Sequence, residues 1–138
     1  MPATSLTHYR SAVAIGLLLL GSAGVAAAWT LFALTLDRLC GWMAVVAAID
    51  AALLLRLARV PASTLRLCLS VLGTLLTIVI ANWWIAGAQL GQMVGLPPWD
   101  AINRMGGFHG WTLITLANGT IDIAWYAIGL CVAALAAR

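Results

Sequence analysis

Charged side chains are scarce in this sequence: lysine and glutamate are absent, and only 8% of the residues are charged. Soluble domains carry about 25% charged residues, because their surface has to be solvated. So small a share excludes a water-soluble globular domain. With 64% hydrophobic residues and a mean hydropathy of +1.05, the chain is expected to lie in lipid.

The sequence also lacks the residue clusters on which most catalytic and metal sites depend. The three cysteines form no CxxC pair and no cluster with histidine, and HExxH, GxSxG and lysine-containing phosphate loops are missing. His8 and His109 are expected on opposite sides of the membrane, which excludes a haem held between two helices. We therefore expect no metal and no cofactor.

Four long apolar stretches predict an all-α integral membrane protein with a single transmembrane domain over residues 1–138. A crossing needs about 20 apolar residues at 1.5 Å each. The expected spans are residues 11–36, 39–57, 64–89 and 119–137. Short connections make successive spans antiparallel, so the predicted architecture is an antiparallel four-helix bundle.

The first stretch also allows a second interpretation, as a secretory signal. His8 and Arg10 precede an apolar run, and three successive alanines at positions 26–28 offer a small-residue cleavage site. The hydrophobicity continues without a break to Leu36, beyond the length of a signal sequence. We therefore favour a membrane helix that is retained.

Residues 92–118 are too polar and too rich in glycine and proline to cross lipid. Asp100 and Arg104 add charge to this segment. Apolar side chains nevertheless recur within it at helical spacing, at Trp99, Ile102, Met105 and Phe108. The spacing predicts one short amphipathic helix that lies in the outer membrane interface, between the third and fourth spans.

Arginine is distributed unevenly over the predicted loops. Two arginines fall on one side of the membrane, and five fall on the other, namely Arg10, Arg56, Arg59, Arg66 and Arg138. Short cytoplasmic loops are enriched in arginine, so both termini are expected in the cytoplasm. Such scattered positions do not form a nucleic-acid-binding patch. The amino-acid composition, with arginine in place of lysine and many alanines, suggests a GC-rich bacterial genome and hence a bacterial inner membrane.

All seven tryptophans fall in the outer half of the membrane or in the outer loop under this topology. One interpretation is an interfacial aromatic belt, although belts normally occupy both interfaces. The other is an aromatic-walled groove roofed by residues 92–118. Candidates for holding a lipid head group in it are Asn82, Trp83, Trp84, Arg104, Asp122 and Trp125. Asp122 has an alternative role at the start of the fourth helix, whose dipole favours a carboxylate.

Asp50 is an acid within the second predicted span. An ionised carboxylate in hydrocarbon is costly unless it is paired. It forms either a polar clasp with Thr74 and Thr77 of the third span or a proton or ligand site, and we favour the clasp.

Gly87, Gly91 and Gly95 form a four-residue repeat at the outer end of the third span. Such rows let helix backbones approach closely. The glycines are expected to pack either inside the bundle or against another subunit.

Three functions remain open. The first expectation is a non-enzymatic accessory subunit that associates with another membrane protein or with a second copy of itself. The second is a small transporter or lipid-head-group-binding protein that uses the tryptophan groove and Asp50. The third is a lipid-modifying enzyme, which would require Asp122 and His109 within hydrogen-bonding reach of one another.

Overall fold

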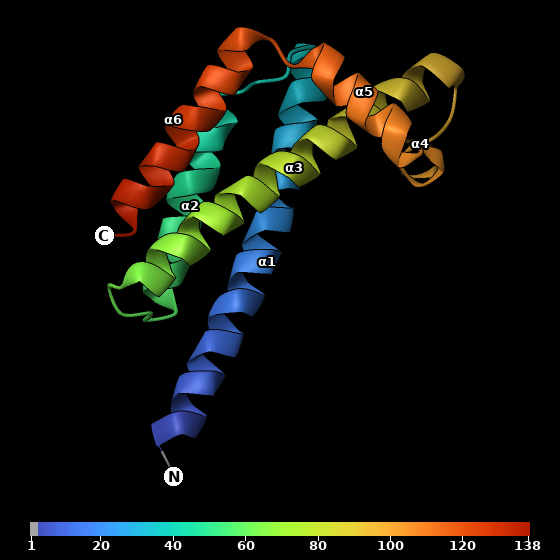
Figure 1. Ribbon diagram of the computed structural model, residues 1–138. Coiled ribbons are helices and arrows are strands. Elements are labelled where there is room, and N and C mark those ends of the chain that lie inside the picture. The colour runs from blue at the N-terminus through green and yellow to red at the C-terminus, as the bar shows by residue number, and fades with distance from the viewer. Residues whose placement is uncertain (1–2) are drawn as a thin grey trace.

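The computed structural model describes residues 3–138, with side chains from residue 5 onward. All regular secondary structure in this part of the chain is helical, and the helices form a bent, elongated molecule (Figure 1). They are α1 (Ala3–Leu36), α2 (Met43–Leu57), α3 (Thr64–Val94), α4 (Pro98–Arg104), α5 (Gly107–Ala117) and α6 (Thr120–Ala136). The predicted all-α fold class is confirmed.

Two of these helices are long and apolar enough to cross a membrane, α1 and α3. At 1.5 Å per residue, the 34 residues of α1 extend about 51 Å and the 31 residues of α3 about 46 Å. A hydrocarbon core is about 30 Å thick. α5 and α6 together form a third candidate, which is bent by 98° at its break. The chain therefore has the helices of a membrane protein.

The second and fourth predicted spans are shorter than expected. α2 contains 15 residues and α6 contains 17, below the roughly 20 residues of a full crossing. α2 begins four residues later than predicted because residues 37–42 form a connection. Within this connection Asp37 and Cys40 have φ angles of 50° and 53°. A left-handed conformation at two non-glycine residues interrupts the helix there.

Residues 92–118 contain two helices where the sequence predicted one. α3 continues to Val94, and α4 and α5 follow. Met105 and Gly106 are extended, with ψ angles of 116° and 155°, so Trp99 and Phe108 belong to different helices. The apolar spacing gave the right secondary structure, but it did not reveal the break.

The helices pack through small side chains. Ala26, Ala33, Ala44 and Ala81 are completely buried around Trp29. α2 packs against α6, and α1 packs against α3. Within each of these two pairs the helices run parallel to one another (Figure 1). Alanine and glycine let backbones approach closely where lipid removes the hydrophobic driving force.

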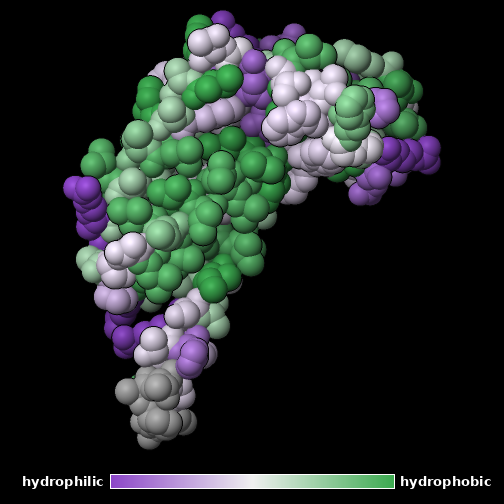
Figure 2. Space-filling model, viewed as in Figure 1, coloured by the Kyte–Doolittle hydropathy of each residue, from purple (hydrophilic) through white to green (hydrophobic). Residues whose placement is uncertain are grey.

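The two ends of the molecule differ in composition. The N-terminus, the α2–α3 connection and the C-terminus lie toward one end, whereas the α1–α2 and α5–α6 connections lie at the other (Figure 1). Figure 2 shows hydrophobic side chains over the middle of the molecule and hydrophilic side chains toward its ends. This distribution matches a protein whose middle contacts lipid.

Candidate functional site

A cavity of about 580 Å³ lies between α3, α5 and α6. Its apolar walls are formed by Ile78, Val79, Trp83, Trp111, Ile114 and Ile123. Its polar side chains are Asn82, Thr115, Asn118 and Tyr126. A mostly apolar cavity of a few hundred Å³ with a few convergent polar groups is typical of small-molecule sites.

The three helices place these polar groups through local features of the sequence. Asn82 lies on the buried face of α3, where only 5% of its surface is exposed. Asn118 ends α5 with an extended backbone, at ψ 114°. Tyr126 lies in α6, beyond the sharp bend. The break between α5 and α6 thus brings an asparagine from the connection to the depth of Asn82.

Asn82, Asn118 and Tyr126 form one hydrogen-bonded network. The Nδ2 of Asn118 donates to Asn82 Oδ1 over 2.8 Å, and the Nδ2 of Asn82 donates to the Tyr126 hydroxyl over 3.1 Å. The Tyr126 hydroxyl in turn donates to Asn82 Oδ1 over 3.3 Å. Hydrogen bonds replace water for these groups, because unpaired polar atoms are costly in an apolar environment.

Both asparagines also donate to carbonyls of their own helices. Asn82 Nδ2 lies 2.8 Å from the carbonyl oxygen of Ile78, and Asn118 Nδ2 lies 2.7 Å from that of Ile114. Each amide nitrogen therefore donates twice, which uses both of its N–H groups. Turning the amide of Asn118 over would place its oxygen against two acceptors, so the hydrogen bonds fix its orientation.

One acceptor of the network has no partner. Asn118 Oδ1 is buried and makes no hydrogen bond. Leaving a buried acceptor unpaired costs about 1–3 kcal/mol, so this atom marks the one unsatisfied position of the network. Asn118 also lines the cavity.

The tryptophans predicted for a groove are divided among different environments. Trp83 lines the cavity, and its ring packs on Gly110 of α5, where no Cβ would fit. Trp84 packs against the buried cluster around Trp29. Trp125 lies on α6 at a second cavity. Only one of the three predicted ring systems therefore contributes to the site between α3, α5 and α6.

The second cavity, of about 430 Å³, lies between the α1–α2 connection and the start of α6. It contains Asp122 and Trp125, together with Arg38 and Trp42 of the connection. Asp122 Oδ2 accepts the N–H of Gly119 over 3.1 Å, a contact that caps the helix. The structure therefore separates Asp122 from Asn82, with which we expected it to share a groove.

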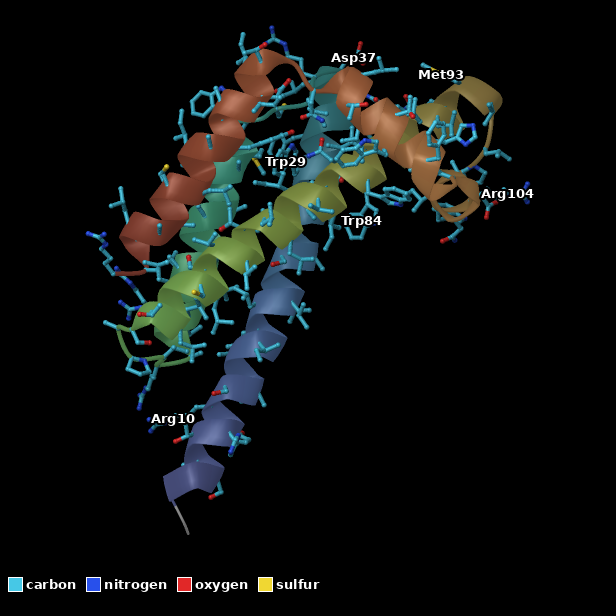
Figure 3. The ribbon with its side chains drawn as sticks, viewed as in Figure 1. Arg10, Trp29, Asp37, Trp84, Met93 and Arg104 are labelled. Carbon is cyan, nitrogen blue, oxygen red and sulfur yellow. The ribbon has the colours of Figure 1, made fainter. Side chains whose placement is uncertain are left out.

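Arg104 lies apart from both cavities. It is the last residue of α4 and is exposed. Figure 3 shows it at the tip of α4, pointing away from the helices. The predicted combination of Asn82, Arg104 and Asp122 around one head group is therefore not assembled in this structure.

The expected clasp around Asp50 is also not formed. Thr74 donates to the carbonyl of Ser70 over 2.8 Å, and Thr77 donates to that of Gly73 over 2.9 Å. These bonds stay within α3. Asp50 instead faces α1, where a Cβ on Gly21 would stand 3.0 Å from its Oδ2. α2 directs the carboxyl group toward a different helix from the one we expected.

The glycine repeat packs within the chain. A Cβ on Gly87 would stand 3.1 Å from the Cα of Ile102, and one on Gly91 would stand 3.1 Å from the Cβ of Ala101. Both contacts are with α4. Gly95 has a φ of 72° and ends α3 in the left-handed conformation, which favours glycine. The repeat thus lets α4 pack back onto α3.

The enzymatic interpretation gains no support from the geometry. His109 lies on α5, exposed, with its ring in edge contact with Phe108, whereas Asp122 lines the second cavity. No hydrogen bond or ion pair joins these two residues in the described chain. Residues 3–138 also contain no group of three or more residues able to hold a metal ion.

Sequence reasoning missed the part played by Tyr126. The sequence contained a signal for it, since Asn82 and Tyr126 are polar residues within otherwise apolar stretches at similar depth. Trp29 was assigned to a belt or a groove, yet it is completely buried and in edge contact with Tyr126, with ring centroids 5.9 Å apart.

No family model, curated protein or solved structure matches this chain. The case for its function therefore rests on the geometry of the chain itself.

Proposed function

We propose that the chain crosses a bacterial inner membrane four times, by α1, α2, α3 and α6, with both termini in the cytoplasm. The short helices α2 and α6 cross as partners of the longer ones, against which they pack. The four helices would alternate in direction across the membrane, and α4 and α5 would lie at its outer side.

The arginines support this orientation. Arg56 donates to the carbonyl of Ala136 over 2.9 Å, and Arg66 donates to that of Ala137 over 2.7 Å. Arg10 and Arg59 line one cavity. These four arginines therefore lie at the same end of the molecule as the two termini, and arginine is enriched on the cytoplasmic side.

Labelling of single cysteines tests this topology. In a chain without native cysteines, Ser63→Cys should be protected from an impermeant thiol reagent added outside intact cells, and Asn103→Cys should be labelled. Equal labelling of the two positions would contradict four crossings.

For its function, we propose that the protein binds a lipid-like amphiphile in the cavity between α3, α5 and α6. The single observation that carries this proposal is the combination of apolar walls with a polar network in one 580 Å³ cavity. The apolar body of the ligand would pack against Ile78, Ile114 and Ile123, and its polar end would lie at Asn82 and Asn118.

The site is suited to binding and not to catalysis. No aspartate, glutamate, histidine, lysine or arginine lines the cavity, so general acid–base chemistry has no group of suitable pKa there. A protein that takes up and releases an amphiphile, as a carrier or a lipid-binding protein, needs only reversible contacts of the kind present.

A bulky side chain in the cavity tests this function. Ile123 lines the cavity, whereas Ile128 is an exposed residue of the same helix that lines neither cavity. Lipid analysis of the chain purified in native membrane discs should show an enriched amphiphile that Ile123→Trp loses and Ile128→Trp keeps. Equal lipid content in both variants would refute the proposal.

An accessory subunit remains the second candidate, because one observation favours it. Gly16 and Gly24 of α1 are exposed and have no neighbouring atom within 4 Å of an added Cβ. Small residues on a membrane-facing helix are where a partner helix docks. Crosslinking through Gly24→Cys in native membranes, compared with Leu53→Cys on the exposed face of α2, tests it: only the first should trap a partner or a second copy.

A further inference from the structure

The polar groups of the cavity are almost entirely used as donors. Both N–H groups of Asn82 and of Asn118 donate within the network or to their own helices. The hydroxyl of Tyr126 donates to Asn82, and that of Thr115 donates to the carbonyl of Thr112 over 2.9 Å. A ligand that needs a hydrogen-bond donor would find none free among these four side chains.

The acceptors, in contrast, are not all used in hydrogen bonds. Asn118 Oδ1 has no partner at all, and the oxygen of Thr115 has lone pairs that its donated bond leaves free. The amide of Asn118 cannot turn over to offer a donor, because both of its N–H groups are held at 2.7 and 2.8 Å. The site is therefore complementary to a group that donates a hydrogen bond.

The charge of the ligand follows from the same lining. The cavity holds no charged side chain, and an ion moved out of water without a counterion loses its hydration at great cost. A phosphate or an ammonium group inside the cavity would find no counterion among its lining residues. The polar end of the ligand is therefore uncharged.

On the basis of the function proposed above, we infer that the ligand is a neutral amphiphile whose polar end donates a hydrogen bond to Asn118 Oδ1, as a long-chain alcohol or a primary or secondary amide does. Esters, ethers and ketones of the same shape lack this donor and would leave the oxygen unpaired. The site thus distinguishes otherwise similar ligands by whether they carry this one hydrogen-bond donor.

Asn118 Oδ1 is covered in this conformation, so the ligand reaches it only through a displacement at the break between α5 and α6. Asn118 and Gly119 are the two residues between these helices. α5 contacts α3 through Gly110 and Trp83, and Trp83 also lines the cavity.

The test compares two probes that differ in one group. Native mass spectrometry of the full chain in detergent, titrated with 1-hexadecanol or with hexadecyl methyl ether, should show saturable binding of one alcohol per chain, about ten-fold tighter than the ether. In Asn118→Ala the alcohol and the ether should bind with about equal affinity. Thr115→Val, which removes the neighbouring acceptor from the same wall, should keep the preference.

The outcomes separate this inference from the proposed function. Equal affinity of the wild-type chain for alcohol and ether would overturn the inference while leaving the cavity a binding site, provided that Ile123→Trp abolishes both. Failure of both probes to bind saturably, with no effect of Ile123→Trp, would overturn the proposed function as well. Loss of the preference in Thr115→Val would show that Thr115, not Asn118, is the acceptor. The comparison of alcohol and ether binding uses the wild-type chain alone, so the test remains decisive even where Asn118→Ala folds poorly.

Discussion

The indole N–H of Trp29 donates a 2.7 Å hydrogen bond to the carbonyl oxygen of Leu39. Trp29 lies in α1, near the end that faces the α1–α2 connection, and Leu39 lies in that connection. The ring is completely buried, and Figure 3 shows it among α1, α2, α3 and α6. One side chain thus fixes the connection to the core of the molecule.

Trp29→Phe should destabilise the protein by about 1–3 kcal/mol, because it leaves the Leu39 carbonyl without its donor. Trp42→Phe is the matched control, since Trp42 belongs to the same region but is 43% exposed. Thermal unfolding in detergent measures both. A similar shift for the two variants would show that the hydrogen bond contributes little.

Gly129→Ala should destabilise the contact between α2 and α6. A Cβ at this position would stand 2.8 Å from the backbone oxygen of Ala44, which cannot move without shifting α2. Overpacking of this kind costs about 1–3 kcal/mol.

The control for this prediction is Gly24→Ala, because a Cβ at Gly24 meets no atom within 4 Å. Alanine is the better helix former, by about 1 kcal/mol, so this variant should be neutral or more stable. Unfolding of the two purified variants in the same detergent gives the comparison. Destabilisation by Gly24→Ala would indicate that α1 has a partner at this position.

Asn82→Ala should cost more stability than Tyr126→Phe. The first change removes the acceptor of Asn118 and the donor to Tyr126 together, whereas the second leaves the bond between the two asparagines in place. We expect about 1 kcal/mol for the tyrosine and at least twice that for the asparagine. Chemical unfolding measures the difference, and the reverse order would show that the hydroxyl organises the network.

Arg66→Lys should loosen the C-terminal turn of α6 while preserving the charge. The guanidinium of Arg66 donates to Ala137 over 2.7 Å and to Val60 over 3.3 Å, and lysine cannot span both carbonyls in the same planar geometry. Hydrogen exchange over residues 133–138 should become faster. Arg10→Lys, at the same end of the molecule, should leave that exchange unchanged.

The sequence was a good guide to which segments are helical and a poor guide to how the helices are rotated. The polar side chain of Asn82 within an apolar run drew attention to this residue. The sequence could not show that Asp122 lines the cavity beside the α1–α2 connection while Tyr126, one turn later, bonds to Asn82. A helix that is apolar on all sides carries no pattern that identifies its buried face.

Contacts between residues far apart in the sequence could not be predicted either. The orientation of Asp50 toward Gly21 depends on how α1 crosses α2, and residues 92–118 divide into two helices at Met105, which is buried. The glycine repeat was recognised as a packing surface, but the sequence left open whether a subunit or α4 covered it. Each of these outcomes is decided by tertiary packing, which local propensity does not encode.

The length of α3 sets the level at which the polar network meets the bilayer. Tilted by about 20°, a helix crosses a 30 Å hydrocarbon core in about 21 residues, so some ten of the 31 residues of α3 must stand in the head-group region. If these are the last ten, the lipid tails end close to Asn82, and α4 and α5 rest among the head groups above. A neutral molecule would enter from the lipids, pack its apolar body against the cavity walls and turn its polar end inward, so that uptake would not require it to pass through water.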